Sequence, residues 1–178
     1  MRKREMDELG RPDPEKYKKL PKIPLVVVLD NIRSQQNVGS VFRTADAYLI
    51  EKIFLCGITA VPPHREIHRA ALGATESVDW IYAQETCDVL TNLKKQGFLI
   101  AGVEQCHPSL SLRDFLQQPS QKTAIVFGNE VNGISDEAIP LLDVCLELPQ
   151  FGTKHSLNVS VCAGIVIWEL FHWQRKAT

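Results

Sequence analysis

The chain has 178 residues, of which 44% are hydrophobic and 23% are charged, a composition typical of one globular domain with a hydrophobic core. Its formal net charge is -1, so the chain as a whole has no excess of positive charge that would indicate a polyanionic partner. No stretch reaches the roughly 18 apolar residues of a membrane span, and the basic N-terminus lacks the apolar region of a signal peptide. We therefore expect a cytoplasmic protein with no membrane partner.

The charge is distributed unevenly along the chain. Residues 1–24 carry eight basic and five acidic side chains, so the remaining residues carry 12 basic and 16 acidic ones. A basic arm of this kind could contact phosphate groups, although composition alone favours a solvated tail. We predict a basic extension over residues 1–24 and a single domain over residues 25–178.

The cysteines are scattered, odd in number and never in C-x-x-C spacing. Several lie in apolar runs, which indicates buried thiols in a reducing compartment. The five positions are Cys56, Cys87, Cys106, Cys145 and Cys162.

Short apolar runs predict strands, and longer segments with a period near 3.6 residues predict helices. Strands are expected at residues 25–30, 52–56, 78–82, 98–103, 123–127 and 144–148. Helices are expected at residues 37–50, 64–74, 85–96, 110–116, 135–142 and 156–173. We also expect Gly97 to end the third helix as its C-cap. This alternation predicts an α/β fold whose mostly parallel sheet is covered by helices on both faces.

Ligands bind beyond the carboxyl ends of the strands in such sheets, which directs attention to three polar clusters. The first cluster is DNIRSQQNVGSVFRTADA, which begins at Asp30. Asn37, Ser40 and Arg43 are spaced by three and share one helix face, opposite the apolar stripe. The guanidinium of Arg43 suits a phosphate. It could equally be a solvated surface group, with Asn37 as a helix cap.

The second cluster is FGNEVNGIS, which begins at Phe127. It fits G-x-x-x-x-G through Gly128 and Gly133, but Ile134 stands where a P-loop needs lysine, so we exclude a nucleoside triphosphatase. A tight turn remains that holds the carboxylate of Glu130 close to backbone. That carboxylate could orient a loop, face a cationic ligand or simply be solvated.

The third cluster, QFGTKHSLNVSV, lies between the last predicted strand and the last predicted helix. Ser156 suits a helix N-cap, and Asn158 is expected in the first turn, where backbone N–H groups lack partners. The helix is apolar nearly all round, so we expect it to be buried deep in the fold or in a subunit interface.

The three clusters, in this order, resemble the SpoU family of RNA ribose 2′-O-methyltransferases of the SPOUT superfamily. The matching motifs are N-V-G-S-V-F-R-T-A-D-A, I-V-F-G-N-E-V-N-G-I and L-P-Q-F-G-T-K-H-S-L-N-V-S-V. The resemblance implies a C-terminal trefoil knot, an S-adenosyl-L-methionine cofactor, a tRNA or rRNA substrate, and a homodimer formed through the last helix. Knots are rare among folds, and periodicity could not have indicated one.

The resemblance also implies roles for individual residues. Cofactor binding falls to the residues of the second and third motifs, which are Gly128, Asn129, Leu148, Pro149, Gly152, Ser156, Leu157 and Asn158. The catalytic centre is formed by Arg43, Asn37, Glu130, Ser156 and Asn158. The resemblance implies that Arg43 reaches the site from the other subunit. We expect it to fix an RNA phosphate, because a guanidinium is a poor base.

Two alternatives stay open on the sequence. The chain could be a catalytically inactive SpoU-like RNA-binding scaffold, or a relative that methylates nitrogen or carbon.

His64 and His68 could ligate zinc, but the H-E-x-x-H order and a third ligand are missing, so we predict no metal and a basic surface with Arg69. Trp168 and Trp173 are expected to pack rather than to stack on bases.

Overall fold

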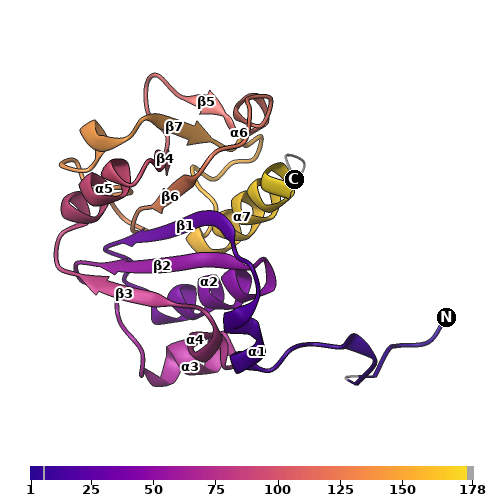
Figure 1. Ribbon diagram of the computed structural model, residues 1–178. Coiled ribbons are helices and arrows are strands. Elements are labelled where there is room, and N and C mark those ends of the chain that lie inside the picture. The colour runs from indigo at the N-terminus through magenta and orange to yellow at the C-terminus, as the bar shows by residue number, and fades with distance from the viewer. Residues whose placement is uncertain (6, 176–178) are drawn as a thin grey trace.

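A seven-stranded sheet forms the centre of the computed structural model, which describes residues 1–5 and 7–175 (Figure 1). Every pair of neighbouring strands is parallel, which confirms the predicted sheet. The last residues of the predicted domain, 176–178, and Met6 of the predicted extension lie outside the described residues. In order across the sheet, the strands are β3 (Trp80–Ala83), β2 (Ile50–Cys56), β1 (Ile23–Asp30), β6 (Thr123–Phe127), β4 (Leu99–Val103), β7 (Val144–Glu147) and β5 (Leu110–Ser111).

Helices and short 3-10 turns connect the strands. They are η1 (Asp7–Leu9), α1 (Pro14–Lys19), α2 (Gln35–Ala47), α3 (Arg65–Ala71), α4 (Ala74–Ser77), α5 (Thr86–Lys95), α6 (Leu112–Phe115), η2 (Ile139–Leu141) and α7 (Val159–Arg175).

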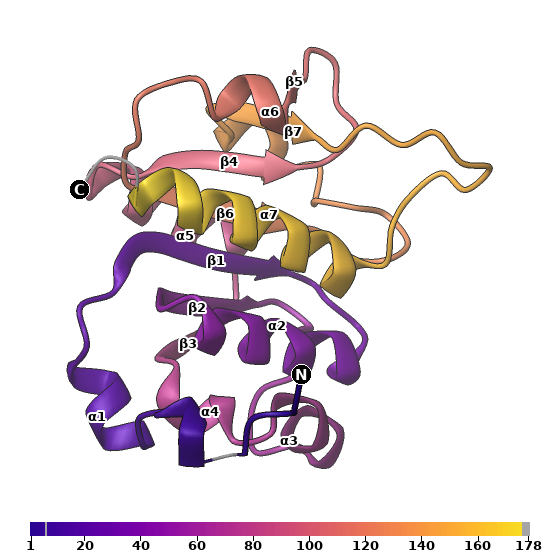
Figure 2. The same ribbon diagram turned by 90° about the vertical axis from the view of Figure 1, so that its right-hand side faces the viewer.

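The residues of β1 show why helices cover both faces of the sheet. Successive side chains of a strand point to opposite faces. Val26 and Val28 pack in one cluster with Leu90 of α5, whereas Val27 and Leu29 pack in a second cluster with α2 and α7. Figure 2 shows α2 and α7 in front of the sheet. Burial on both faces accounts for the continuous apolar run of this strand.

Several predicted element boundaries were wrong for identifiable backbone reasons. The helix predicted at residues 64–74 is broken into α3 and α4, because Leu72 and Gly73 both have positive φ angles, 49° and 87°. The helix predicted at residues 135–142 reduces to the 3-10 turn η2, which contains Pro140 and therefore lacks one backbone donor. Gly97 has a φ angle of 84° just after α5, as predicted for a C-cap.

Residues 110–116 were predicted as a helix, but they begin as the edge strand β5 and only then form the single turn α6. Ser111 explains the change, because its hydroxyl accepts a hydrogen bond from the backbone N–H of Asp114 at 3.1 Å and so caps α6. The helix predicted at residues 37–50 begins at Gln35, ends at Ala47, and gives way to β2 at Ile50.

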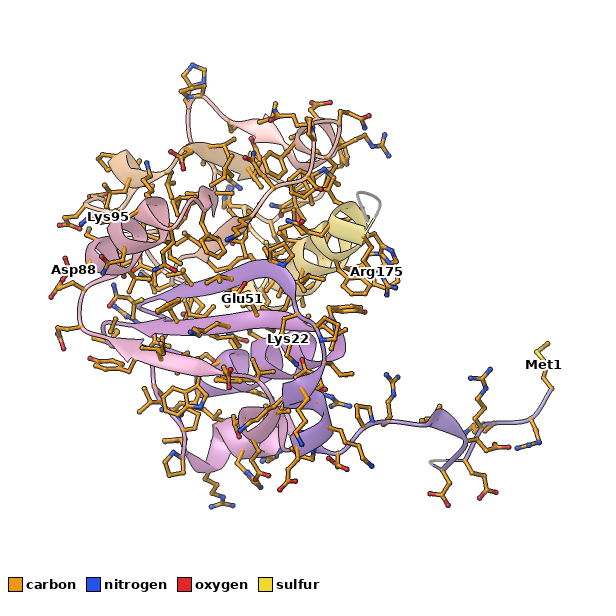
Figure 3. The ribbon with its side chains drawn as sticks, viewed as in Figure 1. Met1, Lys22, Glu51, Asp88, Lys95 and Arg175 are labelled. Atoms are coloured by element: carbon orange, nitrogen blue, oxygen red, sulfur yellow. The ribbon has the colours of Figure 1, made fainter. Side chains whose placement is uncertain are left out.

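The N-terminal segment extends away from the sheet, with Met1 at its far end (Figure 3). α1 is attached to the body by Tyr17, which is buried and donates a hydrogen bond from its hydroxyl to the carbonyl of Ala45. The ammonium of Lys22 lies over the Tyr17 ring at 3.2 Å from its centroid. Tyr17 thus anchors α1 to the body, whereas the lysines of α1 stay exposed. The boundary at residue 24 stays a prediction.

Candidate functional site

A cavity of about 530 Å³ lies at the carboxyl ends of three neighbouring strands, β4, β6 and β7. In Figure 2 these strand ends lie on the right, where the segment that connects β7 to α7 extends beyond the sheet. Cavities that bind small molecules in proteins span about 300–1,000 Å³. The lining consists of residues 103–105, 127–133, 146–148 and 155–159, together with Gln150 and Cys162.

The turn that follows β6 requires glycine at two positions. A Cβ atom on Gly128 would lie 2.0 Å from the backbone of both Gly133 and Ile134. Gly133 has a φ angle of 71°, which side chains rarely allow. Asn129 closes the turn through two backbone hydrogen bonds with Gly133, each 3.0 Å long. The absence of side chains leaves main-chain groups of this turn open to the cavity.

Glu130 ties this turn to the N-terminus of α2. Its carboxylate accepts hydrogen bonds from Asn37 Nδ2 at 2.8 Å and from the backbone N–H groups of Arg33 and Ser34 at 3.3 and 3.4 Å. Partial burial raises the pKa of Glu130, but these hydrogen bonds outweigh it, so the pKa lies below its ordinary value. The prediction that a carboxylate is held against backbone here is confirmed, and the group is ionised at neutral pH.

Asn37 is a bridging residue rather than a helix cap. Ser34 caps α2, because its hydroxyl accepts a hydrogen bond from the backbone N–H of Asn37. The Asn37 side chain is buried and uses both ends, since its Nδ2 donates to Glu130 and its Oδ1 accepts from Asn158 Nδ2 at 3.2 Å. One amide therefore joins all three sequence motifs.

The start of the last helix differs from the prediction. α7 begins at Val159, and Asn158 is its N-cap, because Asn158 Oδ1 accepts hydrogen bonds from the backbone N–H groups of Ser160 at 2.9 Å and Val161 at 3.4 Å. Ser156 was wrongly predicted as the cap. It lies two residues before Asn158, in the exposed segment that lines the cavity. An asparagine is as good a cap as a serine, so the sequence did not discriminate between them.

The residues predicted to bind a cofactor are mostly, but not all, at the cavity. Gly128, Asn129, Leu148, Leu157 and the residues flanking Leu157 line it. Pro149 instead lines a separate groove beside α6 and α7, and Gly152 belongs to the exposed segment between β7 and α7 without lining the cavity.

Arg43 lies apart from this cavity. It is exposed on α2, does not line the cavity, and makes no hydrogen bond or ion pair with any described residue. Within one chain, Arg43 is therefore not assembled with Glu130 and Asn158.

Several polar lining residues were missed by sequence reasoning, among them Glu147 at the end of β7. Glu104 and Gln105 follow β4, and His155 precedes Ser156. The rule that ligands bind beyond strand ends applied to β4 as well, but polar and glycine-rich composition drew attention only to the other strands.

The two histidines considered as zinc ligands are not paired on a helix. His64 precedes α3 and caps it, since its Nδ1 accepts a hydrogen bond from the backbone N–H of Glu66 at 3.3 Å. Within residues 1–5 and 7–175, no group of three or more His, Cys, Asp or Glu side chains could hold a metal ion. No helix in the same residues is long and apolar enough to cross a membrane.

The tryptophans and cysteines considered in the sequence differ in how deeply they are buried. Trp173 is buried and its indole N–H donates to the carbonyl of Gln118 at 2.9 Å, as expected for a packing residue. Trp168 packs edge-on against Tyr48 but stays 44% exposed. Cys56 and Cys145 are buried, whereas the other three cysteines are half-buried, and all five are free thiols.

Known proteins are similar to this chain in sequence. A 23S rRNA (guanosine-2′-O-)-methyltransferase, RlmB, from Neisseria meningitidis is 32% identical over 146 residues, which are 82% of this chain and 57% of that protein. A Staphylococcus epidermidis protein assigned to the TrmH family of tRNA/rRNA methyltransferases is 30% identical over 157 residues, covering 88% and 62%. The chain thus spans only about three fifths of the length of these relatives.

Solved structures support the fold and the family. An AdoMet-bound rRNA methyltransferase from Sinorhizobium meliloti has a TM-score of 0.79 and 26% identity, over 88% of this chain and 59% of the other. The A. aeolicus TrmH/SpoU tRNA modifying enzyme has a TM-score of 0.80 over 92% of this chain and 83% of the other, and at 22% identity it supports the fold alone. The model of the SpoU rRNA Methylase family matches residues 24–168, and the chain therefore belongs to this family.

Proposed function

We propose that the protein transfers a methyl group from S-adenosylmethionine (AdoMet) to a ribose 2′-hydroxyl of tRNA or rRNA. The observation that carries the proposal is the junction of the three motifs at one cavity. Asn37 bonds to Glu130, 93 residues later, and to Asn158, 121 residues later. Residues so far apart in sequence meet beside a cavity of cofactor size, and the family membership supports the same reading.

The residues of the cavity fit AdoMet. Gly128 exposes backbone, and apolar side chains of Leu148 and Leu157 can cover an adenine ring, while carboxylates at the rim complement a cation. The cofactor, when bound, supplies a methyl group on a positively charged sulfur. In the proposed site Asn158 and Asn37 hold the α7 segment against the Glu130 turn, which keeps the cavity walls in register.

The acceptor is a weakly acidic hydroxyl that must be aligned and must lose its proton. We propose that Arg43 binds the RNA phosphate next to this hydroxyl and makes its ionisation easier. A guanidinium hardly ever gives up its own proton in a protein, so the hydroxyl proton passes to an acceptor on the RNA phosphate or to water.

The proposal includes a homodimer, because Arg43 does not reach the cavity of its own chain. α7 carries three exposed apolar side chains on one face, Val161 at 53%, Ile165 at 41% and Trp168 at 44%. This face borders α2, the helix that carries Arg43. A second copy bound there would cover the apolar face and bring Arg43 of one subunit to the site of the other.

Finer points of the same proposal concern the chain path and the domain limits. β7 lies between β4 and β5, yet α7 packs on β1 and α2, so the chain must run back from β7 past β4 and β6 toward the middle of the sheet. We propose that this return passes through a loop and forms a trefoil knot, and a crystal structure with an unthreaded C-terminal segment would contradict it. Residues 25–178 are the proposed methyltransferase domain. The free thiols are consistent with a cytoplasmic location.

Two measurements test the reaction. Calorimetric titration with AdoMet should show one bound molecule per chain, and no binding would favour the inactive scaffold instead. Tritium-labelled methyl transfer onto total tRNA and rRNA should then place the label on a ribose, whereas label on a base would overturn the proposed chemistry.

A complementation experiment tests the shared site. Arg43→Ala should abolish transfer with AdoMet binding intact, and Leu157→Trp should fill the cavity and abolish binding. When the two variants are mixed in equal amounts and their subunits exchange, half of the dimers contain one subunit of each variant. Each such dimer has one complete site, formed by the intact cavity of the Arg43→Ala subunit and Arg43 of the other subunit. About a quarter of wild-type activity should therefore return. A mixture that stays inactive, although mixed dimers form, would show that Arg43 does not act across the interface.

A further inference from the structure

The cavity has an unbalanced charge. Three carboxylates line it, those of Glu104, Glu130 and Glu147, and His155 is the only other titratable group apart from the Cys162 thiol. No lysine or arginine among the described residues lines it, and none of the three carboxylates has an ion-pair partner there. Charges that face a partly enclosed space without counter-ions favour a cationic ligand.

The three carboxylates are not equivalent. Glu130 is occupied by three donors at the N-terminus of α2, and Glu147 accepts a hydrogen bond from the Ser109 hydroxyl at 2.9 Å. Glu104 instead stands between the turn after β6 and the first turns of α7. Its Oε2 accepts from the backbone N–H of Ile134 at 3.0 Å, and its Oε1 accepts from the N–H of Gln105 at 2.8 Å.

The surroundings of Glu104 place its charge within the cavity. A Cβ atom on Gly133 would lie 2.0 Å from Glu104 Oε2, so the carboxylate rests directly on the glycine turn. Across the cavity, burial raises the pKa of Cys162 on α7 to about 11, and the negative charge of Glu104 adds to this rise. Two backbone N–H donors hold the carboxylate in place at the cavity wall, where its negative charge can attract a cationic ligand.

We propose that Glu104 is a specificity-determining residue that makes the cavity prefer positively charged AdoMet over its neutral product, S-adenosylhomocysteine. This inference rests on the proposed function, because it takes AdoMet as the ligand. The two molecules differ by one methyl group and one positive charge on sulfur. A fixed carboxylate therefore attracts the substrate more strongly than the product, and the loss of this attraction after methyl transfer favours product release.

The test compares ligand affinities in variants of matched charge. Glu104→Gln keeps the size of the side chain and one acceptor oxygen while it removes the charge. Glu51→Gln makes the same change of net charge at an exposed position near the amino end of β2, away from the cavity (Figure 3). Calorimetry would give the dissociation constants of AdoMet, S-adenosylhomocysteine and sinefungin, which carries an ammonium group in place of the sulfonium.

We expect Glu104→Gln to raise the dissociation constants of AdoMet and sinefungin by about tenfold. The dissociation constant of S-adenosylhomocysteine should rise by less than about threefold. Glu51→Gln should leave all three dissociation constants unchanged, and Glu104→Asp should retain the preference for the cations. Equal loss for charged and neutral ligands in Glu104→Gln would overturn the proposal, because it would show that Glu104 only supports the glycine turn. Unchanged affinities would overturn it as well.

A measurement on the wild-type protein keeps the proposal testable if Glu104→Gln does not fold. Raising the ionic strength should weaken the binding of AdoMet and sinefungin but not that of S-adenosylhomocysteine, because salt screens the attraction between a cation and the carboxylates. Equal salt dependence of all three ligands would contradict the proposal. A wild-type protein that binds none of them would contradict the proposed function itself, which is a different outcome.

Discussion

The N-cap of α7 offers the sharpest test of how the site is assembled. Asn158 does two separate things with one side chain, because its Oδ1 caps the helix and its Nδ2 donates to Asn37. Asn158→Ser retains the cap and removes the link, whereas Asn158→Ala removes both. The two substitutions therefore separate the stability of the helix from the integrity of the site.

The expected magnitudes follow from these contacts. Loss of a cap costs about 1 kcal/mol, and loss of the hydrogen bond to Asn37 costs about another 1 kcal/mol. The free energy of unfolding should fall by about 1 kcal/mol in Asn158→Ser and by about 2 kcal/mol in Asn158→Ala. For a chain of this length the melting temperature should drop by about 2–4 °C per kcal/mol.

Urea unfolding and methyl transfer measured on the same preparations test the reasoning. Both variants should lose methyl transfer to a similar extent, because both release Asn37 and loosen its hold on Glu130. Equal stability of the Ser and Ala variants would refute the cap assignment. Full activity in Asn158→Ser would refute the role of the link between the motifs.

Three further changes have defined outcomes. Gly128→Ala should lower the free energy of unfolding by about 3 kcal/mol and weaken AdoMet binding, because its Cβ would overlap backbone; Gly152→Ala, which has open space, is the control for both calorimetry and urea unfolding. The folded-state pKa of Glu130 is lowered, so its contribution to stability is present above the ordinary carboxyl pKa and is lost as pH falls below it. Between about pH 5 and pH 3, the free energy of unfolding measured with urea should therefore fall less in Glu130→Gln than in wild type. If the free energy of unfolding depends on pH in the same way in both proteins, the lowered pKa of Glu130 is contradicted. Replacing Lys18 and Lys19 of α1 by Ala should weaken RNA binding and flatten its dependence on log salt concentration by up to about two units, with AdoMet binding unchanged; an unaltered salt slope in filter binding would rule out the arm as a phosphate contact.

The sequence was sufficient to predict the class of fold. The apolar runs of β1, β4 and β6 are buried on both sides of a parallel sheet, and burial on both sides requires residues that are apolar without alternation. Helix ends were less accurate, because Leu72 and Gly73 interrupt an otherwise helical pattern, and a positive φ at a leucine cannot be foreseen from propensity.

The candidate site could be predicted only by its parts. Gly128, Glu130 and Asn158 were identified in the sequence, but Glu104 was not, because nothing near it in the chain indicates that it would rest on the turn at Gly133. The same limit applies to Asn37, whose role as a bridge depends on two partners that are distant in sequence.

The sequence by itself determined the buried strands, the glycine turn after β6 and the polar residues before α7, because each of these depends on local backbone conformation and on the order of apolar residues. Only the tertiary structure decided that Asn37 joins Glu130 to Asn158, that Glu104 faces the cavity, and that Arg43 lies outside it. These facts depend on the order of strands across the sheet and on the return of α7 to β1 and α2, which bring together residues that no local interaction connects.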